Sequence, residues 1–157
     1  MFHRWAALVL VLALCAMTPK NAAGQSTQSP RGHSASGKLG SNYPNPFNPD
    51  TYLPFSVGPA GCVPGTGQYD VTMQLINVLG QVVAEPTLFG AGQGSSATFS
   101  ASQKGQPIRH MTLPCGDYVG YWNGKMPNGR EAASGVLGEV LTVDRDPPAT
   151  RKIFYKK

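Results

Sequence analysis

Apolar and polar residues alternate in several short runs along the chain. The clearest run, residues 69–76 (YDVTMQLI), places an apolar side chain at every second position. This period of two is typical of a β-strand with one buried face. We predict further strands at residues 52–57, 81–85, 95–102, 117–122, 136–143 and 149–155, a turn at residues 77–80, and an ambiguous segment at residues 107–113.

These predicted strands indicate the fold class. About seven short strands separated by turns are typical of two packed antiparallel sheets, and no segment has the period of a long amphipathic helix. We therefore predict an all-β protein with a single immunoglobulin-like antiparallel β-sandwich. The 19 glycines and 14 prolines among 157 residues agree with this prediction, because long helices tolerate neither residue well.

The N-terminus has the pattern of a secretory signal. Residues 5–17 form an uncharged apolar run, which is shorter than the ~20 residues of a membrane-spanning helix but fits the ~7–15 residues of a signal core. Small residues after it predict cleavage behind Ala23 or Gly24. We assign residues 1–23 to a signal peptide and expect an exported chain with no stable membrane span. The alternative is a lipoprotein signal at Cys15, although the leucine before it is larger than such a signal prefers.

Two segments of different composition follow the signal. Residues 24–41 are rich in Ser, Gly and Gln, so we expect a flexible leader that buries little surface. The sandwich is expected at residues 42–157. It begins with a proline-rich lead-in, residues 42–51 (NYPNPFNPDT), which we expect to be stiff and to dock on the domain. The motif residues of this lead-in are Tyr43, Pro44, Asn45, Pro46, Phe47, Asn48 and Pro49.

Cys62 and Cys115 remain once the signal is removed. An even pair of cysteines in an oxidising compartment predicts a disulfide. Closing a loop of roughly 50 residues would stabilise the fold by about 3–4 kcal/mol. The alternative is a pair of buried free thiols.

The formal charge of +5 has little bearing on the folded part, because the excess basic residues lie in the signal and leader. Proteins that bind nucleic acid usually present a basic face with several phosphate contacts. In the folded part of this chain, basic residues are clustered only at residues 151–157. We read them as a solvated final strand whose charges protect a sheet edge, with a binding surface as the alternative, and we expect no nucleic-acid partner.

Four segments resemble, in order, a known family of domains. They are NYPNPFNPDTYLPFSV, YDVTMQLINVLGQVV, YWNGKMPNGREAASGV and ATRKIFYKK. The combination is similar to the C-terminal sorting domains of type IX secretion and, in turn, to the immunoglobulin-like domain of flagellar hook-capping proteins. Two positions depart from the family pattern: Leu137 replaces an aromatic residue, and Asn123 replaces an aspartate.

The resemblance implies a function in sorting. In that family the sandwich follows a larger cargo, and outer-membrane secretion machinery reads its last strands. The implied location is the cell surface, the outer membrane or the medium, with the periplasm as the alternative. The second functional hypothesis is a stand-alone immunoglobulin-like module that binds or assembles with another envelope protein. The sorting residues implied for this chain are Gly135, Val136, Thr150, Arg151, Lys152, Lys156 and Lys157.

Other motif residues have a structural interpretation. We expect Trp122 to pack in the core. The Asn-Gly pairs that contain Gly124 and Gly129 suit turns with positive φ.

The folded part offers little for catalysis. His110 is its only histidine, so no histidine pair exists there for zinc or for acid–base chemistry. A thiol–imidazole pair of His110 with Cys115 is conceivable, but a disulfide at Cys115 would exclude it. Asp144 and Asp146 either form a polar turn or begin a cation site. We predict a protein that is not an enzyme, with no cofactor, no metal and no small-molecule substrate.

Overall fold

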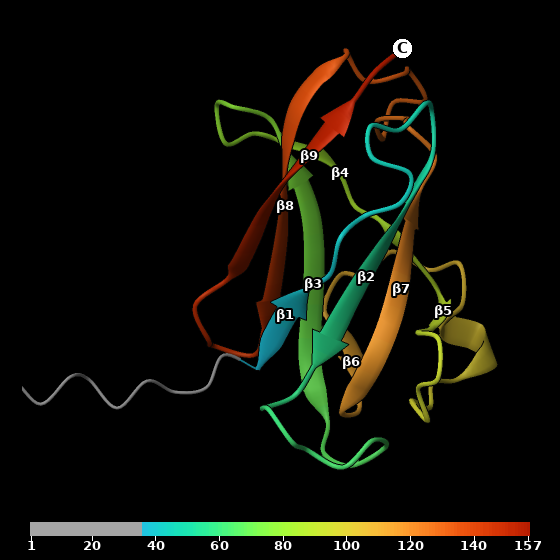
Figure 1. The fold of residues 1–157 in the computed structure, drawn as a ribbon, viewed down its shortest axis with the longest axis vertical. Coiled ribbons are helices and arrows are strands. Elements are labelled where there is room, and N and C mark those ends of the chain that lie inside the picture. Colours follow the sequence, from blue (N-terminus) through green and yellow to red (C-terminus); the bar gives the residue numbers. More distant parts are fainter. Residues whose placement is uncertain (1–35) are drawn as a thin grey trace, which may run out of the picture. The chain divides into compact units, whose positions relative to one another are not determined.

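The computed structural model describes residues 36–157, so the predicted signal peptide (1–23), Cys15 and most of the predicted leader lie outside the described residues. The described chain contains nine β-strands and one short 3-10 helix (Figure 1). The strands are β1 (Gly37–Leu39), β2 (Thr51–Val57), β3 (Tyr69–Ile76), β4 (Val82–Ala84), β5 (Thr87–Ala91), β6 (Met111–Leu113), β7 (Gly116–Trp122), β8 (Gly135–Val143) and β9 (Ala149–Tyr155), and the 3-10 helix is η1 (Ala101–Gln103).

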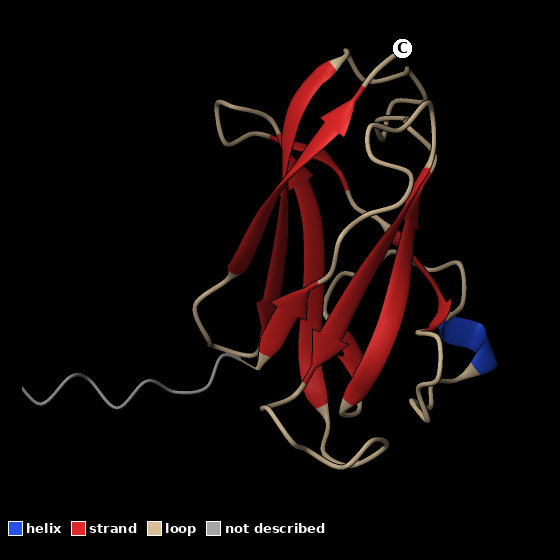
Figure 2. Cartoon of the chain, viewed as in Figure 1, coloured by secondary structure: helices blue, strands red, loops and turns tan. Residues whose placement is uncertain are grey.

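The strands form two antiparallel sheets that pack together (Figure 2). The four-stranded sheet has the order β1-β2-β7-β5, and the five-stranded sheet has the order β4-β3-β8-β9, with β6 pairing to the first residues of β3. Every strand pair named here is antiparallel. The all-β sandwich predicted from the alternating pattern is therefore confirmed.

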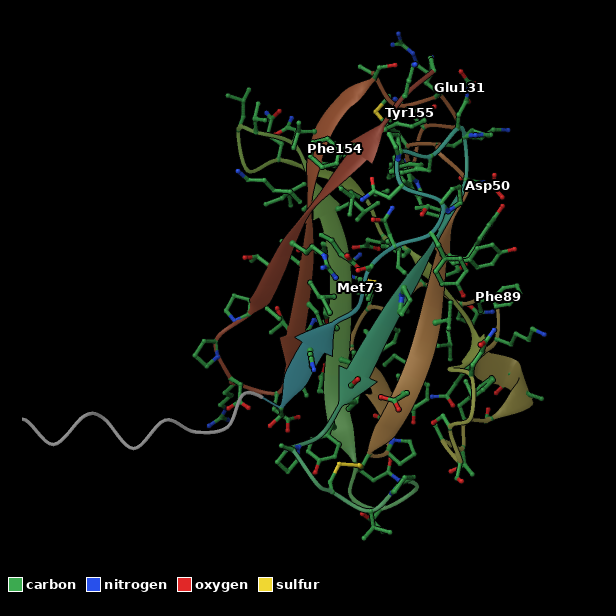
Figure 3. All side chains as sticks on the ribbon, in the orientation of Figure 1. Asp50, Met73, Phe89, Glu131, Phe154 and Tyr155 are labelled. Carbon is green, nitrogen blue, oxygen red and sulfur yellow. A yellow bond between two sulfur atoms is a disulfide. The ribbon has the colours of Figure 1, made fainter. Side chains whose placement is uncertain are left out.

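The core lies between the sheets and follows the two-residue period of the strands. In β2 the buried positions alternate with partly exposed ones, and β3 and β8 behave in the same way. Met73, near the middle of β3 in Figure 3, has no exposed surface. Tyr118 from β7 stacks on Phe55 from β2 at a ring-centroid distance of 5.5 Å. Trp122 is 3% exposed, which confirms its predicted place in the core.

Most strand predictions agree with the structure, and three segments differ. Residues 95–102 are not a strand: Ala97 and Phe99 pack against the core, but the backbone pairs with no sheet and ends in η1. Strand β5 was not predicted, although its Leu88 is fully buried. Strand β1 lies within the expected leader, where it pairs with the end of β2.

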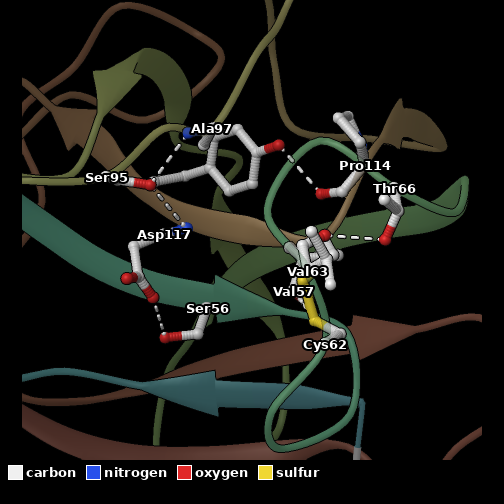
Figure 4. Close-up of a disulfide and its surroundings, with 11 residues drawn as sticks. Ser56, Val57, Cys62, Val63, Thr66, Ser95, Ala97, Pro114 and Asp117 are labelled. Atoms are coloured by element: carbon white, nitrogen blue, oxygen red, sulfur yellow. Dashed lines mark hydrogen bonds between the residues drawn. A yellow bond between two sulfur atoms is a disulfide. The ribbon is translucent and has the colours of Figure 1, made fainter.

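The disulfide between Cys62 and Cys115 is present, with a Cα–Cα distance of 6.3 Å (Figure 4). It joins the loop after β2 to the residue before β7. Backbone bonds support the link, because the Gly65 N–H donates to the Cys115 carbonyl and the Cys115 N–H donates to the Thr66 carbonyl. The predicted pairing is confirmed, and the thiol–imidazole alternative is excluded because Cys115 has no free thiol.

Gly124 and Gly129 both have a φ of 77°, as expected for turns that require the left-handed region. Their surroundings differ. A Cβ on Gly124 would lie 2.5 Å from the Pro49 carbonyl oxygen, whereas a Cβ on Gly129 would meet no atom within 4 Å. Gly124 therefore also allows the proline-rich lead-in to approach the turn after β7.

Candidate functional site

The residues implied in sorting lie on the hairpin of β8 and β9. The register places Gly135 and Val136 opposite Tyr155 and Phe154, next to the last lysines of the chain. Thr150, Arg151 and Lys152 pair further along, opposite the middle of β8. The structure thus brings Gly135, Val136, Lys156 and Lys157 together at one end of the hairpin, and leaves Thr150, Arg151 and Lys152 along its outer strand.

The lead-in docks on the end of β9. The Phe47 N–H donates to the Phe154 carbonyl at 3.1 Å, and the Lys156 N–H donates to the Phe47 carbonyl at 3.0 Å. Phe47 is 1% exposed; its ring stacks on Tyr155 at 5.1 Å and forms a T-shaped contact with Trp122 at 5.7 Å. Burial of one such ring stabilises the fold by about 1.5–3 kcal/mol.

The other lead-in motif residues lie around this anchor. Asn42, itself buried, donates from its side-chain amide to the Pro44 carbonyl at 3.0 Å and to the Thr51 hydroxyl at 3.1 Å. Tyr43 remains 48% exposed and stacks on Tyr52. The remaining motif residues, Pro44, Asn45, Pro46, Asn48 and Pro49, are exposed.

The rest of the β9 edge has no hydrogen-bonded partner strand among the described residues, although β1 of the other sheet lies close to β9. The Phe154 carbonyl and the Lys156 N–H point away from β8 toward Phe47. Because alternate residues of a strand direct their backbone groups to the same edge, those of Thr150 and Lys152 also point away from β8. Within residues 36–157 no strand pairs with them there. Both side chains are exposed, so the first half of β9 has unpaired outer backbone groups and a solvent-exposed lysine.

The chain end is fixed to the turn before β8. The Lys157 N–H donates to the Ser134 hydroxyl at 2.9 Å, and the Lys157 ammonium lies 2.9 Å from the Glu131 carboxylate. The hydrogen bond between the Lys157 ammonium and the Glu131 carboxylate lowers the pKa of Glu131 and raises the pKa of Lys157. Both groups are well exposed, and surface pairs of this kind contribute little to stability. The Lys156 side chain is exposed.

The outer face of the hairpin carries an apolar pair. Val136 is 40% exposed and Phe154 is 47% exposed, and the two face each other across β8 and β9. Cross-strand pairs of this kind stabilise a sheet. They also leave an apolar contact surface beside the open edge of β9.

Glu139 was not identified from the sequence as a buried residue, although it lies at one of the alternate positions of β8 that face the core. It occupies the same inward phase of β8 as Leu137 and Leu141. Its side chain is fully buried, and neither carboxylate oxygen has a hydrogen-bond partner. Burial raises the pKa of Glu139 to about 8, while the charge of Arg151, its partner in the β9 register, acts in the opposite direction.

The residues considered for catalysis or metal binding have structural contacts. The His110 Nδ1 lies 3.2 Å from the Asp70 carboxylate, on the exposed surface. Asp144 accepts from the Asp70 N–H and Asp146 accepts from the Ser36 N–H, so these two aspartates of the turn between β8 and β9 connect that turn to β3 and to the residue before β1. No cluster of three or more potential metal ligands occurs in residues 36–157.

Two further findings bear on function. In the described part of the chain, no helix has the length and apolar character needed to cross a membrane. No family model, curated protein or solved structure matches the chain.

Proposed function

We propose that this protein is a secreted or cell-surface, non-catalytic β-sandwich whose C-terminal strands are the sorting and attachment signal for type IX-like secretion. The partner is the outer-membrane secretion machinery, which adds a strand to the open edge of β9. The observation that carries the proposal is that edge: Thr150 and Lys152 direct unpaired backbone groups away from β8, beside the exposed Phe154. Strand addition at such an edge is a common mode of peptide recognition.

Other features support the proposal. The disulfide between Cys62 and Cys115 is compatible with an exported protein, because such bonds persist in oxidising compartments. The lead-in forms hydrogen bonds only with the end of β9, so one part of this edge is paired and the other is not. The four ordered segments that resemble type IX sorting domains include both the lead-in and β9.

Deleting residues 150–157 is a poor test, because the deletion removes the buried Ile153 and Tyr155 and would disturb the fold itself. Two substitutions avoid this problem. Lys152→Pro removes an N–H that points away from β8, and proline is tolerated on the outer side of edge strands. Phe154→Ala removes a side chain that is 47% exposed. Both variants should fold and should accumulate in the periplasm of a cell that carries a type IX translocon.

Two matched controls separate recognition from folding. Lys152→Ala keeps the backbone N–H and removes only the charge. Phe89→Ala removes a ring that is 46% exposed on the other sheet. Both should reach the cell surface, as measured by cell fractionation and surface proteolysis, with thermal unfolding of each purified variant as the check on folding. Surface levels equal to those of the wild-type protein for both Lys152→Pro and Phe154→Ala would overturn the proposal.

That negative result would favour the second candidate function, an immunoglobulin-like module that binds another envelope protein. The observation in its favour is the turn between β3 and β4, where Val78 is 83% exposed and Leu79 is 78% exposed. Apolar side chains at an exposed turn tip are available for contact with a partner.

A further inference from the structure

Four aromatic rings gather on the outer face of the four-stranded sheet, away from the C-terminal hairpin. Tyr43, Tyr52 and Tyr121 are paired successively across the lead-in, β2 and β7, and Thr87 of β5 continues the same row. Phe89 joins them from β5, at the point where the register of β5 against β7 shifts. We call Tyr43, Tyr52, Phe89 and Tyr121 the aromatic row.

The rings of the aromatic row contact one another and present a shared outer surface. Tyr52 is central, with ring centroids 5.3 Å from Tyr43, 5.0 Å from Phe89 and 5.4 Å from Tyr121. Tyr43 and Phe89 flank it and are 48% and 46% exposed. Part of this arrangement stabilises the sheet, as cross-strand aromatic pairs do. Sheet stability alone does not require two of the rings to remain half in water.

Polar groups of both charges surround the aromatic row. The Tyr121 hydroxyl donates to the Asp50 carboxylate at 3.4 Å, which leaves the phenol oxygen free to accept. The Lys104 ammonium lies 5.7 Å from the centre of the Phe89 ring. Burial, and then the charge of Asp50, raise the pKa of Tyr121, so this phenol stays protonated at neutral pH. Figure 3 shows Asp50 and Phe89 on the same side of the molecule.

A cleft continues the row beyond Tyr121. It has a volume of about 410 Å³, and its lining includes Tyr121, Thr87, Glu85, Lys125 and Met126. This volume falls within the range of roughly 300–1,000 Å³ that small-molecule sites occupy. The row and the cleft therefore form one continuous surface that offers apolar ring faces, hydrogen-bond donors and acceptors, and no excess of either charge.

The size of the aromatic row argues against a protein partner. An aromatic side chain buries ~150–250 Å² when fully covered, so four partly exposed rings offer on the order of 300 Å². A stable protein interface needs about 800 Å² from each partner. The row alone is too small for a second copy of the chain. Its neighbouring rings also pack together, which leaves no slot between them for a proline side chain.

We propose that the aromatic row and its cleft bind a neutral polysaccharide chain. A pyranose ring has an apolar face of C–H groups that stacks on an aromatic ring, and hydroxyls at its edge that both donate and accept. Two sugars of the chain lie on the exposed parts of Tyr43 and Phe89, one on each side of Tyr52. The edge hydroxyls reach the Asp50 carboxylate and the Tyr121 oxygen, and the next sugar enters the cleft beside Thr87. The balanced charge of Asp50 and Lys104 matches an uncharged ligand.

The test is a titration of the full chain with soluble oligosaccharides, in which binding is detected by changes in the amide NMR chemical shifts. The neutral probes are cellohexaose, xylohexaose, mannohexaose and laminarihexaose, and the charged comparator is hexagalacturonate. At least one neutral probe should bind and shift amides around Tyr52 and Tyr121. Phe89→Ala and Tyr43→Ala should each weaken that binding about tenfold or more, since each removes an exposed stacking face.

Phe154→Ala is the matched control, because Phe154 is 47% exposed on the opposite sheet. It should bind the sugar as the wild-type protein does. The proposal is overturned if no neutral probe binds at millimolar concentration, if hexagalacturonate binds in preference, or if folded Phe89→Ala and Tyr43→Ala retain full affinity. Binding of a proline-rich decapeptide to the row, with no response to any sugar, would also overturn it.

Discussion

Replacing Glu139 by glutamine should remove most of the pH dependence of this protein's stability between about pH 5 and about pH 8. Glu139 is a carboxyl group fully enclosed in the sandwich, with both oxygens unpaired. Burial raises its pKa from 4.5 to about 8, and Arg151 offsets only part of that rise. The folded protein therefore keeps a proton that the unfolded chain releases.

The sign and size of the effect follow from proton linkage. Below about pH 4.5 both states are protonated and Glu139 causes no pH-dependent loss of stability. From there to about pH 8 only the native state holds the proton, so the free energy of unfolding falls by about 1.4 kcal/mol per pH unit. The total loss is on the order of 4–5 kcal/mol, and the share reached by pH 7 is on the order of 3 kcal/mol. That is a large part of a typical domain stability of about 5–15 kcal/mol.

Urea unfolding followed by tryptophan fluorescence at a series of pH values measures this loss. The wild-type protein should unfold at progressively lower urea concentration as the pH rises from about 5 to about 8. Glu139→Gln carries no charge at any of these values, so its profile should be flatter, with a gain near neutral pH on the order of 3 kcal/mol. Glu131→Gln is the control, since Glu131 is an exposed carboxylate whose pKa is lowered, and its profile should follow the wild type.

Two outcomes would refute the reasoning. One is a wild-type stability that is constant or rises from about pH 5 to about pH 8. The other is a Glu139→Gln profile that parallels the wild type, because the pH dependence would then come from another group. Comparing the two profiles isolates Glu139 from every other residue that titrates in this range.

The remaining predictions concern the lead-in and the disulfide. Gly124→Ala should destabilise the protein by about 2–3 kcal/mol, because it adds a clash with Pro49 to the strain of positive φ. Gly129→Ala, at the same φ but with no neighbouring atom, should destabilise it by only about 1 kcal/mol. Equal losses of stability in urea unfolding would show that the contact with Pro49 is unimportant. The double variant Cys62→Ser/Cys115→Ser should lose about 4 kcal/mol through the freed loop, measured the same way, and a loss below about 1 kcal/mol would contradict the loop-closure estimate.

The fold was predictable where the alternation is strong. Strands β3 and β9 have the predicted bounds. In β3 the apolar residues occupy every second position from Tyr69 to Leu75, whereas β9 alternates in burial but ends in three consecutive apolar residues. Residues 95–102 show the limit of this signal. Ala97 and Phe99 do pack inward, but inward packing does not supply a neighbouring strand, and the backbone pairs with none. Strand β5 escaped prediction because its pattern is short and interrupted at Phe89 and Gly90.

The candidate sites were less predictable, because they depend on pairings between distant segments. Compartment chemistry and an even count were enough to predict the bond between Cys62 and Cys115. No local pattern reveals that Phe47 meets Trp122 and Tyr155. The open part of the β9 edge likewise depends on how far the lead-in extends along it. Glu139 could have been found, because a carboxylate in phase with buried residues is visible in the sequence of β8.

The two proposed surfaces belong to different sheets, and this separation makes them independently testable. Phe154 lies on β9 of the five-stranded sheet, and Phe89 lies on β5 of the four-stranded sheet, with nearly equal exposure. Substitutions this far from each other's contacts should have additive effects. Phe89→Ala should therefore affect sugar binding but not export, and Phe154→Ala should do the opposite. If one substitution impaired both, the common cause would be the fold, and neither proposal would gain from that variant.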